Sequence, residues 1–343
     1  MTLADDVLQG NRLSLARAIT QVENQTQAGY HLLDELFGSA GKSHLIGVTG
    51  PPGSGKSSLV NQLAKKYRSP AQGKPKRVGI VAVDPSSPFT GGAILGDRVR
   101  MRDLTGDSGV FIRSMASRGS LGGLATATAG VVQVLDAAGF EIIFIETVGA
   151  GQAEVEIARL AHTTLVVEAP GMGDDIQAIK AGILEIADIL VINKADRPGV
   201  DVTSRALRSM LELAHPTRHV FHNHDRFHRE LGQIENHEKN NTGNSAEMTD
   251  IWIPPIQRTV ATEGTGTEDL IQTIEQHHQY LIKSGELIRR DMARLRSQLD
   301  ILLREKLVER WQAQVVDSKY EEMLDKLMRR EISPWQAADC LVE

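Results

Sequence analysis

The sequence predicts an α/β fold with a mostly parallel, doubly wound sheet and helical extensions at both ends of the chain. Short apolar runs alternate with segments long enough for crossover helices, such as 57–67 and 121–138. The runs are apolar throughout rather than alternating, as expected for parallel strands that are buried on both faces. They are LIGVTG (45–50), VGIVAVD (78–84), VFIRS (110–114), EIIFIET (141–147), TLVVEA (164–169) and DILVIN (188–193).

The chain divides into three predicted parts. Residues 1–42 carry two short amphipathic helices, because apolar residues recur there at helical spacing. Residues 43–282 form the α/β domain, and its polar, Asn-rich stretch 222–250 is interpreted as an exposed, partly disordered excursion. Residues 283–343 are helical. Their long amphipathic part is expected to fold on the core or onto a second subunit.

Composition excludes several classes of protein. The chain has 38 Lys and Arg against 44 Asp and Glu, a net charge of −6, which argues against a generic nucleic-acid coat. The single cysteine, Cys340, excludes an intramolecular disulfide framework and a cysteine-based zinc site. No run approaches the roughly 18 apolar residues of a membrane helix, and no secretory signal is recognisable. We therefore expect a cytoplasmic protein that binds neither nucleic acid nor membrane.

A glycine-rich segment between the run 45–50 and the predicted helix 57–67 matches G-x-x-x-x-G-K-[ST]. Glycines let backbone N–H groups turn towards a phosphate, and the helix N-terminus adds partial positive charge. The lysine reaches the β and γ phosphates, and the final hydroxyl ligates Mg²⁺. The motif predicts a P-loop NTPase. Its residues, which we expect to bind nucleotide together with Ser58, are Gly50, Pro51, Pro52, Gly53, Ser54, Gly55, Lys56 and Ser57.

A second motif, Asn193-Lys194-Ala195-Asp196, follows the run ILVI. A carboxylate at a strand end accepts hydrogen bonds from the N1–H and 2-amino groups of guanine. Adenine lacks this pair of donors, so Asp196 would be left unpaired against the wrong base. The stem of Lys194 would flank the ring. Together with the phosphate loop, the motif favours GTP over ATP.

Further carboxylates stand at the ends of other predicted strands. Glu146 and Gly149 belong to E-T-V-G, the place for a strand-terminal carboxylate near a metal and a glycine N–H near the γ-phosphate. Most GTPases have aspartate where this chain has Glu146. Asp84 ends another run, and Asp97 closes the glycine-containing loop after it. Oxygen ligands of this kind suit Mg²⁺.

With these segments, the sequence resembles the MeaB/ArgK-type GTPases, which are methylmalonyl-CoA mutase-associated G-protein chaperones. The resemblance covers nearly the whole chain. It is most specific in GVTGPPGSGKSSLV, AVDPSSPFTGGAILGDRVRM, FIRSMASRGSLGGLA, ETVGAGQAE, PGMGDDIQAIKAGILEIAD and NKAD.

The resemblance implies a SIMIBI-class P-loop GTPase that forms a homodimer through its C-terminal helices. It implies that a switch lies at 170–180 and that the last base-binding loop lies at 260–266, with backbone contacts from Ala261 and Thr262. The implied guanine-binding residues are Asn193, Lys194 and Asp196. The implied Mg²⁺-handling residues are Ser57, Asp84, Asp97 and Glu146.

The implied role is to gate delivery of adenosylcobalamin to a B12-dependent acyl-CoA mutase and to protect or reactivate it. Hydrolysis of GTP to GDP would act as the switch, slow alone and accelerated by a partner. The candidate catalytic residues are Lys56, Asp84 and Gln152. A Ras-like protein has glutamine where this chain has Ala150, so the residue that positions water stays open. Arg113 and Arg118 are either transition-state charge neutralisers or exposed surface arginines.

Two alternatives belong to other classes. A nickel-loading metallochaperone is one, because neutral imidazoles bind such metals and five histidines lie close together, at positions 215, 219, 222, 224 and 228. A small-molecule (amino-acid) kinase is the other. It would need an acceptor pocket and a base beside the γ-phosphate.

Overall fold

The computed structural model describes residues 2–84, 101–104, 106–116, 121–147, 153–171, 185–214, 251–313 and 317–342. The chain forms two compact units, residues 1–291 and residues 292–343. No described helix is both long and apolar enough to cross a membrane.

The first unit is built on a seven-stranded sheet in the order β3-β2-β4-β1-β5-β6-β7. The strand pairs between these neighbours are all parallel, which confirms the predicted fold class. Strands β2, β3 and β4 lie on one side of β1, with β4 directly beside it, and β5, β6 and β7 follow on the other side, so the sheet is doubly wound. The strands are β1 (His44–Thr49), β2 (Val78–Asp84), β3 (Val110–Ala116), β4 (Ile142–Thr147), β5 (Thr163–Glu168), β6 (Ile189–Ile192) and β7 (Ile256–Arg258).

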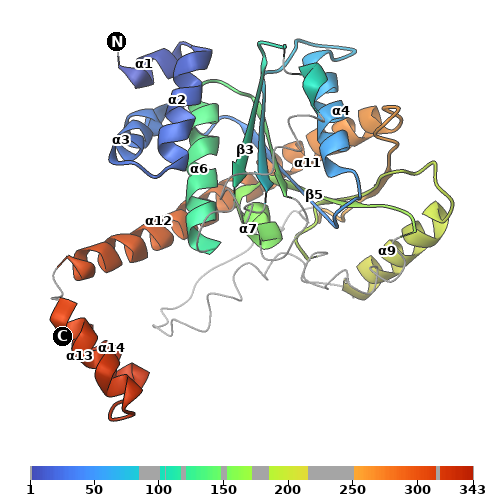
Figure 1. The fold of residues 1–343 in the computed structure, drawn as a ribbon. Helices are drawn as coiled ribbons and strands as arrows, with labels where there is room; N and C mark the ends of the chain where they lie inside the picture. Colours follow the sequence, from blue (N-terminus) through green and yellow to red (C-terminus); the bar gives the residue numbers. More distant parts are fainter. Residues whose placement is uncertain are drawn as a thin grey trace, which may run out of the picture. The chain divides into compact units, whose positions relative to one another are not determined.

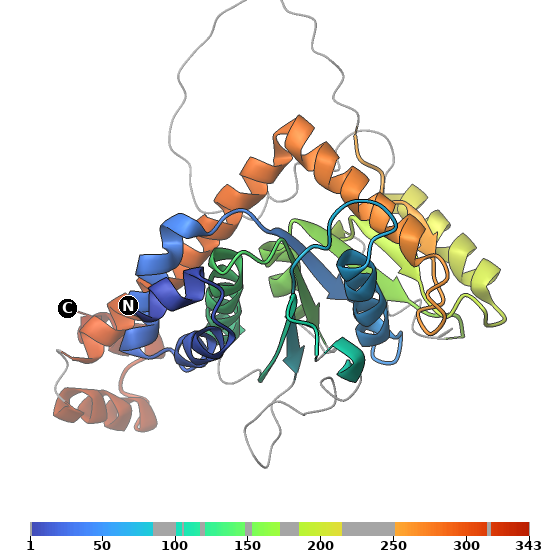
Figure 2. The same ribbon diagram turned by 90° about the horizontal axis from the view of Figure 1, so that it is seen from above.

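Helices cover both faces of this sheet, which explains why the strands are apolar throughout. On one face, α2 (Arg12–Glu23) and α6 (Leu121–Ala137) pack against side chains such as Leu45 and Ile143. On the other face, α4 (Lys56–Arg68) and α11 (Thr267–Ser284) pack against the next residues along the same strands, such as Ile46 and Phe144. Figures 1 and 2 show the two helical layers on either side of the strands.

The N-terminal extension contains three helices where the sequence predicts two. These are α1 (Leu3–Leu8), α2 and α3 (Gln27–Leu36), and α3 leads into the short η1 (Phe37–Ser39). Thr26 caps α3 by accepting a hydrogen bond from the Gly29 N–H. A Cβ at Gly29 would lie 2.6 Å from the Gln21 carbonyl oxygen, so glycine lets α3 approach α2 closely. That glycine, in a helix interior, concealed the third helix because it weakens the helical pattern.

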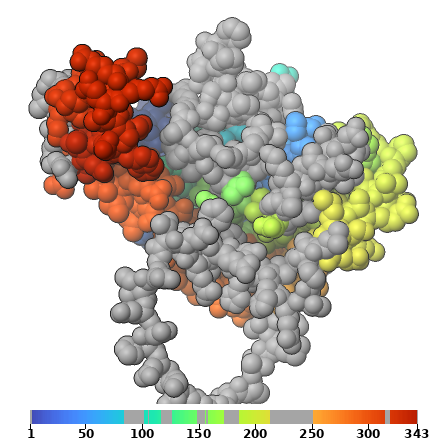
Figure 3. All heavy atoms as spheres, turned by 90° about the horizontal axis from the view of Figure 1, so that it is seen from below, coloured from blue at the N-terminus to red at the C-terminus, as the bar shows by residue number. Residues whose placement is uncertain are grey.

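Further described elements of the first unit are η2 (Arg102–Leu104), α7 (Ala153–Leu160) and α9 (Val200–Ala214). Leu207 and Leu211 of α9 pack against Leu190 and Ile192 of β6. The outer side of α9 carries the exposed Val202, and Figure 3 shows this helix in yellow at the molecular surface.

The second unit contains most of α12 (Glu286–Gln312), together with α13 (Asp317–Met328) and α14 (Pro334–Val342). The Trp311 indole N–H donates to the Leu341 carbonyl oxygen at 2.6 Å and thereby joins the end of α12 to α14. Met323 of α13 and Ala337 of α14 are buried. No described residue of α12 is buried, although the Trp311 ring near its end packs against Tyr320 of α13.

Candidate functional site

The phosphate loop lies directly after β1, at the carboxyl end of the sheet. The ammonium of Lys56 is buried and donates to the carbonyl oxygens of Gly50 at 2.8 Å and Pro51 at 3.0 Å. Gly55 precedes α4 with a φ of 91°, and no side chain caps the N-terminus of this helix. The N–H groups at the start of a helix point out of its end, and together with the partial positive charge there they favour an anion.

Two glycines of this loop are required by close approaches to other elements. A Cβ at Gly50, whose φ is 133°, would lie 2.1 Å from the Val167 carbonyl oxygen of β5. A Cβ at Gly55 would lie 2.4 Å from Nδ2 of Asn193. A side chain at either position would push the loop off the sheet or off the guanine motif, so the glycines set the position of the loop.

Asn193 joins the guanine motif to the phosphate loop. Its side-chain amide donates to the Ser54 carbonyl oxygen at 2.9 Å, and its Oδ1 accepts from the Ala261 N–H at 3.0 Å. The hydroxyl of Thr259 donates to the same oxygen at 3.2 Å. One buried side chain therefore fixes three segments: the phosphate loop, the end of β6 and the loop after β7.

Lys194 and Asp196 stand beside this junction. Lys194 adopts a left-handed backbone conformation with a φ of 57°, and its ammonium donates to the Gly53 carbonyl oxygen at 2.6 Å. Asp196 and Thr262 are exposed, whereas Ala261 is buried. The structure thus brings the Asn193 motif and the loop 260–266 together beside the phosphate loop.

The predicted metal-handling residues are only partly described. Oγ of Ser57 donates to Oε1 of Glu146 at 2.6 Å, and both residues are buried. This contact joins the first turn of α4 to the end of β4. Asp84 ends β2, which pairs with β4. Several predicted residues and segments lie outside the described residues. They are Asp97, Arg118, Gly149, Gln152, most of the segment 170–180, the histidines at 215–228 and the stretch 222–250.

Arg113 does not face the phosphate loop. It lies on β3, and its guanidinium forms an ion pair with Glu23 of α2. Its suggested role as a transition-state charge neutraliser is therefore wrong, because its guanidinium pairs with Glu23 on the face of the sheet that α2 and α6 cover. Neither is it an exposed surface arginine, since both partners are mostly covered.

One residue of the site was missed from the sequence. Thr259 follows β7 and donates a hydrogen bond to Asn193, while its N–H binds the Ile192 carbonyl oxygen at 2.9 Å. The only sequence signal was its place directly before the loop 260–266. No motif distinguishes a single threonine at that position from any other residue at the end of a strand.

Comparison with known proteins places this geometry in a family. The family model described as methylmalonyl-CoA mutase-associated GTPase MeaB matches residues 15–316. A protein from Pyrococcus abyssi, provisionally named a GTPase, is 40% identical over 341 residues, which cover 99% of this chain and 95% of that protein. The GTPase ArgK of Escherichia coli is 40% identical over 221 residues, which cover 62% of this chain and 65% of ArgK.

A solved structure has the same overall fold. The crystal structure described as a LAO/AO transport system kinase superposes with a TM-score of 0.67 and 25% sequence identity. The match covers 99% of this chain and 95% of that one. The phosphate loop, the guanine motif joined to it and the family match over most of the length agree with one another. The chain therefore belongs to the MeaB family of methylmalonyl-CoA mutase-associated GTPases.

Proposed function

We propose that this protein is a cytoplasmic, GTP-hydrolysing chaperone of a B12-dependent acyl-CoA mutase. It gates delivery of adenosylcobalamin to the mutase, and it protects or reactivates that enzyme. The observation that carries the proposal is the junction made by Asn193, which ties a phosphate loop to a guanine motif, in a chain of a mutase-associated family. GTP hydrolysis then serves as the switch of the chaperone.

The described residues divide the recognition of GTP between phosphates and base. The phosphates would bind the loop 50–55, Lys56 and the first-turn N–H groups that include Ser57 and Ser58. The buried Oγ of Ser54 has no hydrogen-bond partner among the described residues, which supports a ligand here. Asp196 would bind the guanine edge, Lys194 would flank the ring, and the loop at Ala261 and Thr262 would contact the base through its backbone.

The donor atoms near the phosphate loop fit Mg²⁺. Ser57 and Glu146 offer a hydroxyl and a carboxylate oxygen 2.6 Å apart at the helix N-terminus, and Mg²⁺ prefers such oxygens with phosphate and water. Asp84 and Asp97 are the further proposed ligands. A bound Mg²⁺ would neutralise charge on the β and γ phosphates.

The protein's own contribution to hydrolysis is mainly positioning. Lys56 would hold the γ-phosphate, and the N–H groups of α4 would hold its oxygens as negative charge redistributes between them. We propose Gln152 to orient the attacking water. We expect hydrolysis to be slow alone and faster with the partner bound.

An exposed apolar stripe on α12 supports a homodimer. Its residues recur every three or four positions on one side of the helix, and all are exposed. A stripe of this length favours burial against another helix. The residues of the stripe are Met292, Leu295, Leu299, Leu303 and Leu307. Replacing both Leu299 and Leu303 by glutamate should halve the molecular mass measured by light scattering. An unchanged dimer mass would contradict this interface.

Co-elution with candidate mutases tests the chaperone role. The protein is mixed with methylmalonyl-CoA mutase or isobutyryl-CoA mutase in the presence of GDP or a non-hydrolysable GTP analogue. One mutase should co-elute, and the amount should depend on the nucleotide. If the amount of co-eluting mutase is the same with GDP and with the GTP analogue for every mutase, the proposal is contradicted. Parallel nickel titrations and assays of phosphoryl transfer from GTP to amino acids separate the metallochaperone and kinase alternatives.

A further inference from the structure

A cavity of about 1130 Å³ lies at the opposite end of the sheet from the phosphate loop. Its wall combines the amino ends of β1 and β4, the segment before β2, the last turn of α4 and one side of α11. All of these elements belong to the first unit. The volume is slightly above the roughly 300–1,000 Å³ typical of small-molecule sites, so a small organic molecule fits, and no residue assigned to GTP lines the cavity.

Tyr67 gives the first sign that this cavity holds a ligand. Its side chain is 3% exposed, and its ring packs against Phe144 with 6.1 Å between centroids. Its buried hydroxyl has no hydrogen-bond partner among the described residues. Burial and the nearby Glu275 carboxylate raise the pKa of Tyr67, so the hydroxyl remains a neutral donor. Such an orphaned group is uncommon in a folded protein, and a ligand acceptor would satisfy it.

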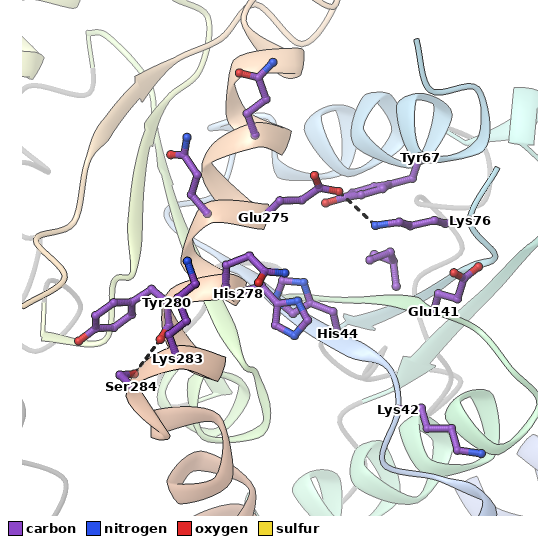
Figure 4. Close-up of a pocket in the computed structure, with 14 residues that line it drawn as sticks. Lys42, His44, Tyr67, Lys76, Glu141, Glu275, His278, Tyr280, Lys283 and Ser284 are labelled. Atoms are coloured by element: carbon purple, nitrogen blue, oxygen red, sulfur yellow. Dashed lines mark hydrogen bonds and ion pairs between the residues drawn. The ribbon is translucent and has the colours of Figure 1, made fainter. Parts of the chain in front are cut away.

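A stacked pair of histidines forms another part of the wall. The rings of His44 and His278 are nearly parallel, with 4.0 Å between centroids. Nε2 of His44 lies 2.7 Å from the Thr163 hydroxyl oxygen, which lies 2.9 Å from Nδ1 of His277. Figure 4 shows the His44–His278 stack between Tyr67 and Lys283. This chain of contacts holds the wall in one geometry, which lowers the ordering cost of binding.

The wall around this stack is rich in donors. Lys76 and Glu275 neutralise each other across 3.1 Å, whereas no described carboxylate lies within ion-pair distance of Lys42 or Lys283. Three glutamines of α11 add amide N–H donors: Gln272, Gln276 and Gln279. Glu141 is the remaining acid, and its Oε2 accepts from the Arg77 N–H at 3.1 Å.

We propose that this cavity binds a small organic anion, which places carboxylate or phosphate oxygens near Lys283 and Lys42 and an acceptor near the Tyr67 hydroxyl. Charge-assisted hydrogen bonds from lysine supply the affinity, and the tyrosine supplies the orientation. The site is separate from the GTP site and does not rest on the proposed chaperone role.

Calorimetric titration of the full-length protein tests this site. Saturating GDP and Mg²⁺ block the phosphate loop, and the probes are succinate and glycerol 3-phosphate. Their uncharged counterparts, succinamide and glycerol, are titrated in parallel. At least one anion should bind, and which one binds distinguishes a carboxylate ligand from a phosphate ligand. Absence of binding by both anions at about 10 mM, or equal binding by the uncharged counterparts, would overturn the proposal.

Three variants locate the binding. Lys283→Gln removes a charge and Tyr67→Phe removes only the hydroxyl, so each should weaken the bound anion about tenfold. Lys66→Gln is the matched control, because Lys66 is a half-exposed lysine of α4 that pairs with Glu268 outside the cavity. GDP affinity and melting temperature should stay as in the wild type. Equal affinity in all variants, or an equal loss in the control, would show that the anion binds elsewhere.

Discussion

The two ends of the strands are assembled in different ways. At the carboxyl ends, the phosphate loop is one unbroken run of residues, joined to the guanine motif by Asn193. At the amino ends, a polar cluster is formed by Asp188, His277 and Arg290, which come from segments far apart in the chain. There, Asp188 accepts two hydrogen bonds from Arg290, both at 2.8 Å, and lies 3.3 Å from His277.

This difference follows from the groups that each end uses: backbone N–H groups at the carboxyl ends and side chains at the amino ends. A phosphate is bound largely by backbone N–H groups, which only consecutive residues present together. The amino-end cluster uses side chains, so any residue that the fold brings close can contribute. We expect substitutions at the carboxyl ends to alter GTP chemistry and substitutions at the amino ends to alter stability or the proposed anion site. The following predictions test that separation.

The largest effect is expected for Lys56→Ala. Loss of the ammonium removes a charge that stabilises the transferring phosphoryl group, so the hydrolysis rate should fall by at least about 10³-fold. Single-turnover assays with labelled GTP measure this rate. Succinate or glycerol 3-phosphate should still bind at the amino ends as in the wild type. Retention of more than a tenth of the hydrolysis rate would contradict the role of Lys56.

A large loss of stability is expected for Arg290→Met. Asp188 is buried. Although burial raises its pKa, the Arg290 guanidinium and His277 hold that pKa well below the usual range. Removing the arginine leaves this charge poorly compensated, which should lower the free energy of unfolding by about 3 kcal/mol. Urea titration measures the change. The neighbouring Arg289→Met breaks a pair between the exposed Arg289 and Glu286 within one helix, and should cost less than about 0.5 kcal/mol.

Asp196→Asn should weaken GTP binding about 10- to 100-fold, because the amide cannot accept both guanine hydrogen bonds. Competition with a fluorescent guanine nucleotide measures the change. Xanthosine triphosphate, which offers an acceptor at position 2, should gain affinity in this variant. The exposed Asp201→Asn is the control, since Asp201 pairs with Arg258 outside the phosphate loop. Wild-type preference for GTP in the Asp196 variant would contradict the assignment.

The smallest effect is a pH dependence at the amino ends. Burial lowers the pKa of His44 well below 6.5, and it also lowers that of the half-buried His278. The neighbouring His162, His277 and Lys76 act in the same direction on both, whereas Glu275 opposes the shift of His278.

The sign of this effect follows from proton binding. Near pH 6 the unfolded chain binds more protons than the folded chain, so stability is complete above about pH 7 and declines as the pH falls. The slope should not exceed about 1.4 kcal/mol per pH unit for each histidine. Urea titrations from pH 7.5 to 5.5 measure it. His278→Gln should reduce the slope, and an unchanged slope would contradict its contribution.

The sequence predicted the fold well because its signals are local. The apolar runs correspond to β1 through β6, and the helix expected at 57–67 is α4. The third N-terminal helix escaped because Gly29 weakens its pattern, although the fold needs that glycine for close packing. The cavity at the amino ends was not predictable, since Tyr67, His44 and Lys283 belong to no motif and meet only after folding.

The sequence motifs identify the consecutive residues of the candidate site. The structure places the phosphate loop, the motif at 193–196 and Ser57 with Glu146 at one end of the sheet. The contact between Asn193 and the loop after β7 joins residues 68 positions apart, and no spacing rule fixes that distance. The ion pair of Arg113 with Glu23 likewise depends on how α2 packs, which the sequence around Arg113 does not reveal.

Gly50 shows that the phosphate loop is not a portable module. Its backbone passes so close to the Val167 carbonyl of β5 that no side chain fits between them. A designer who grafted the loop onto another parallel sheet would have to transplant the neighbouring strand as well, or find one whose backbone leaves the same gap. The first glycine of the motif is therefore required partly by β5, a strand more than a hundred residues away in the sequence.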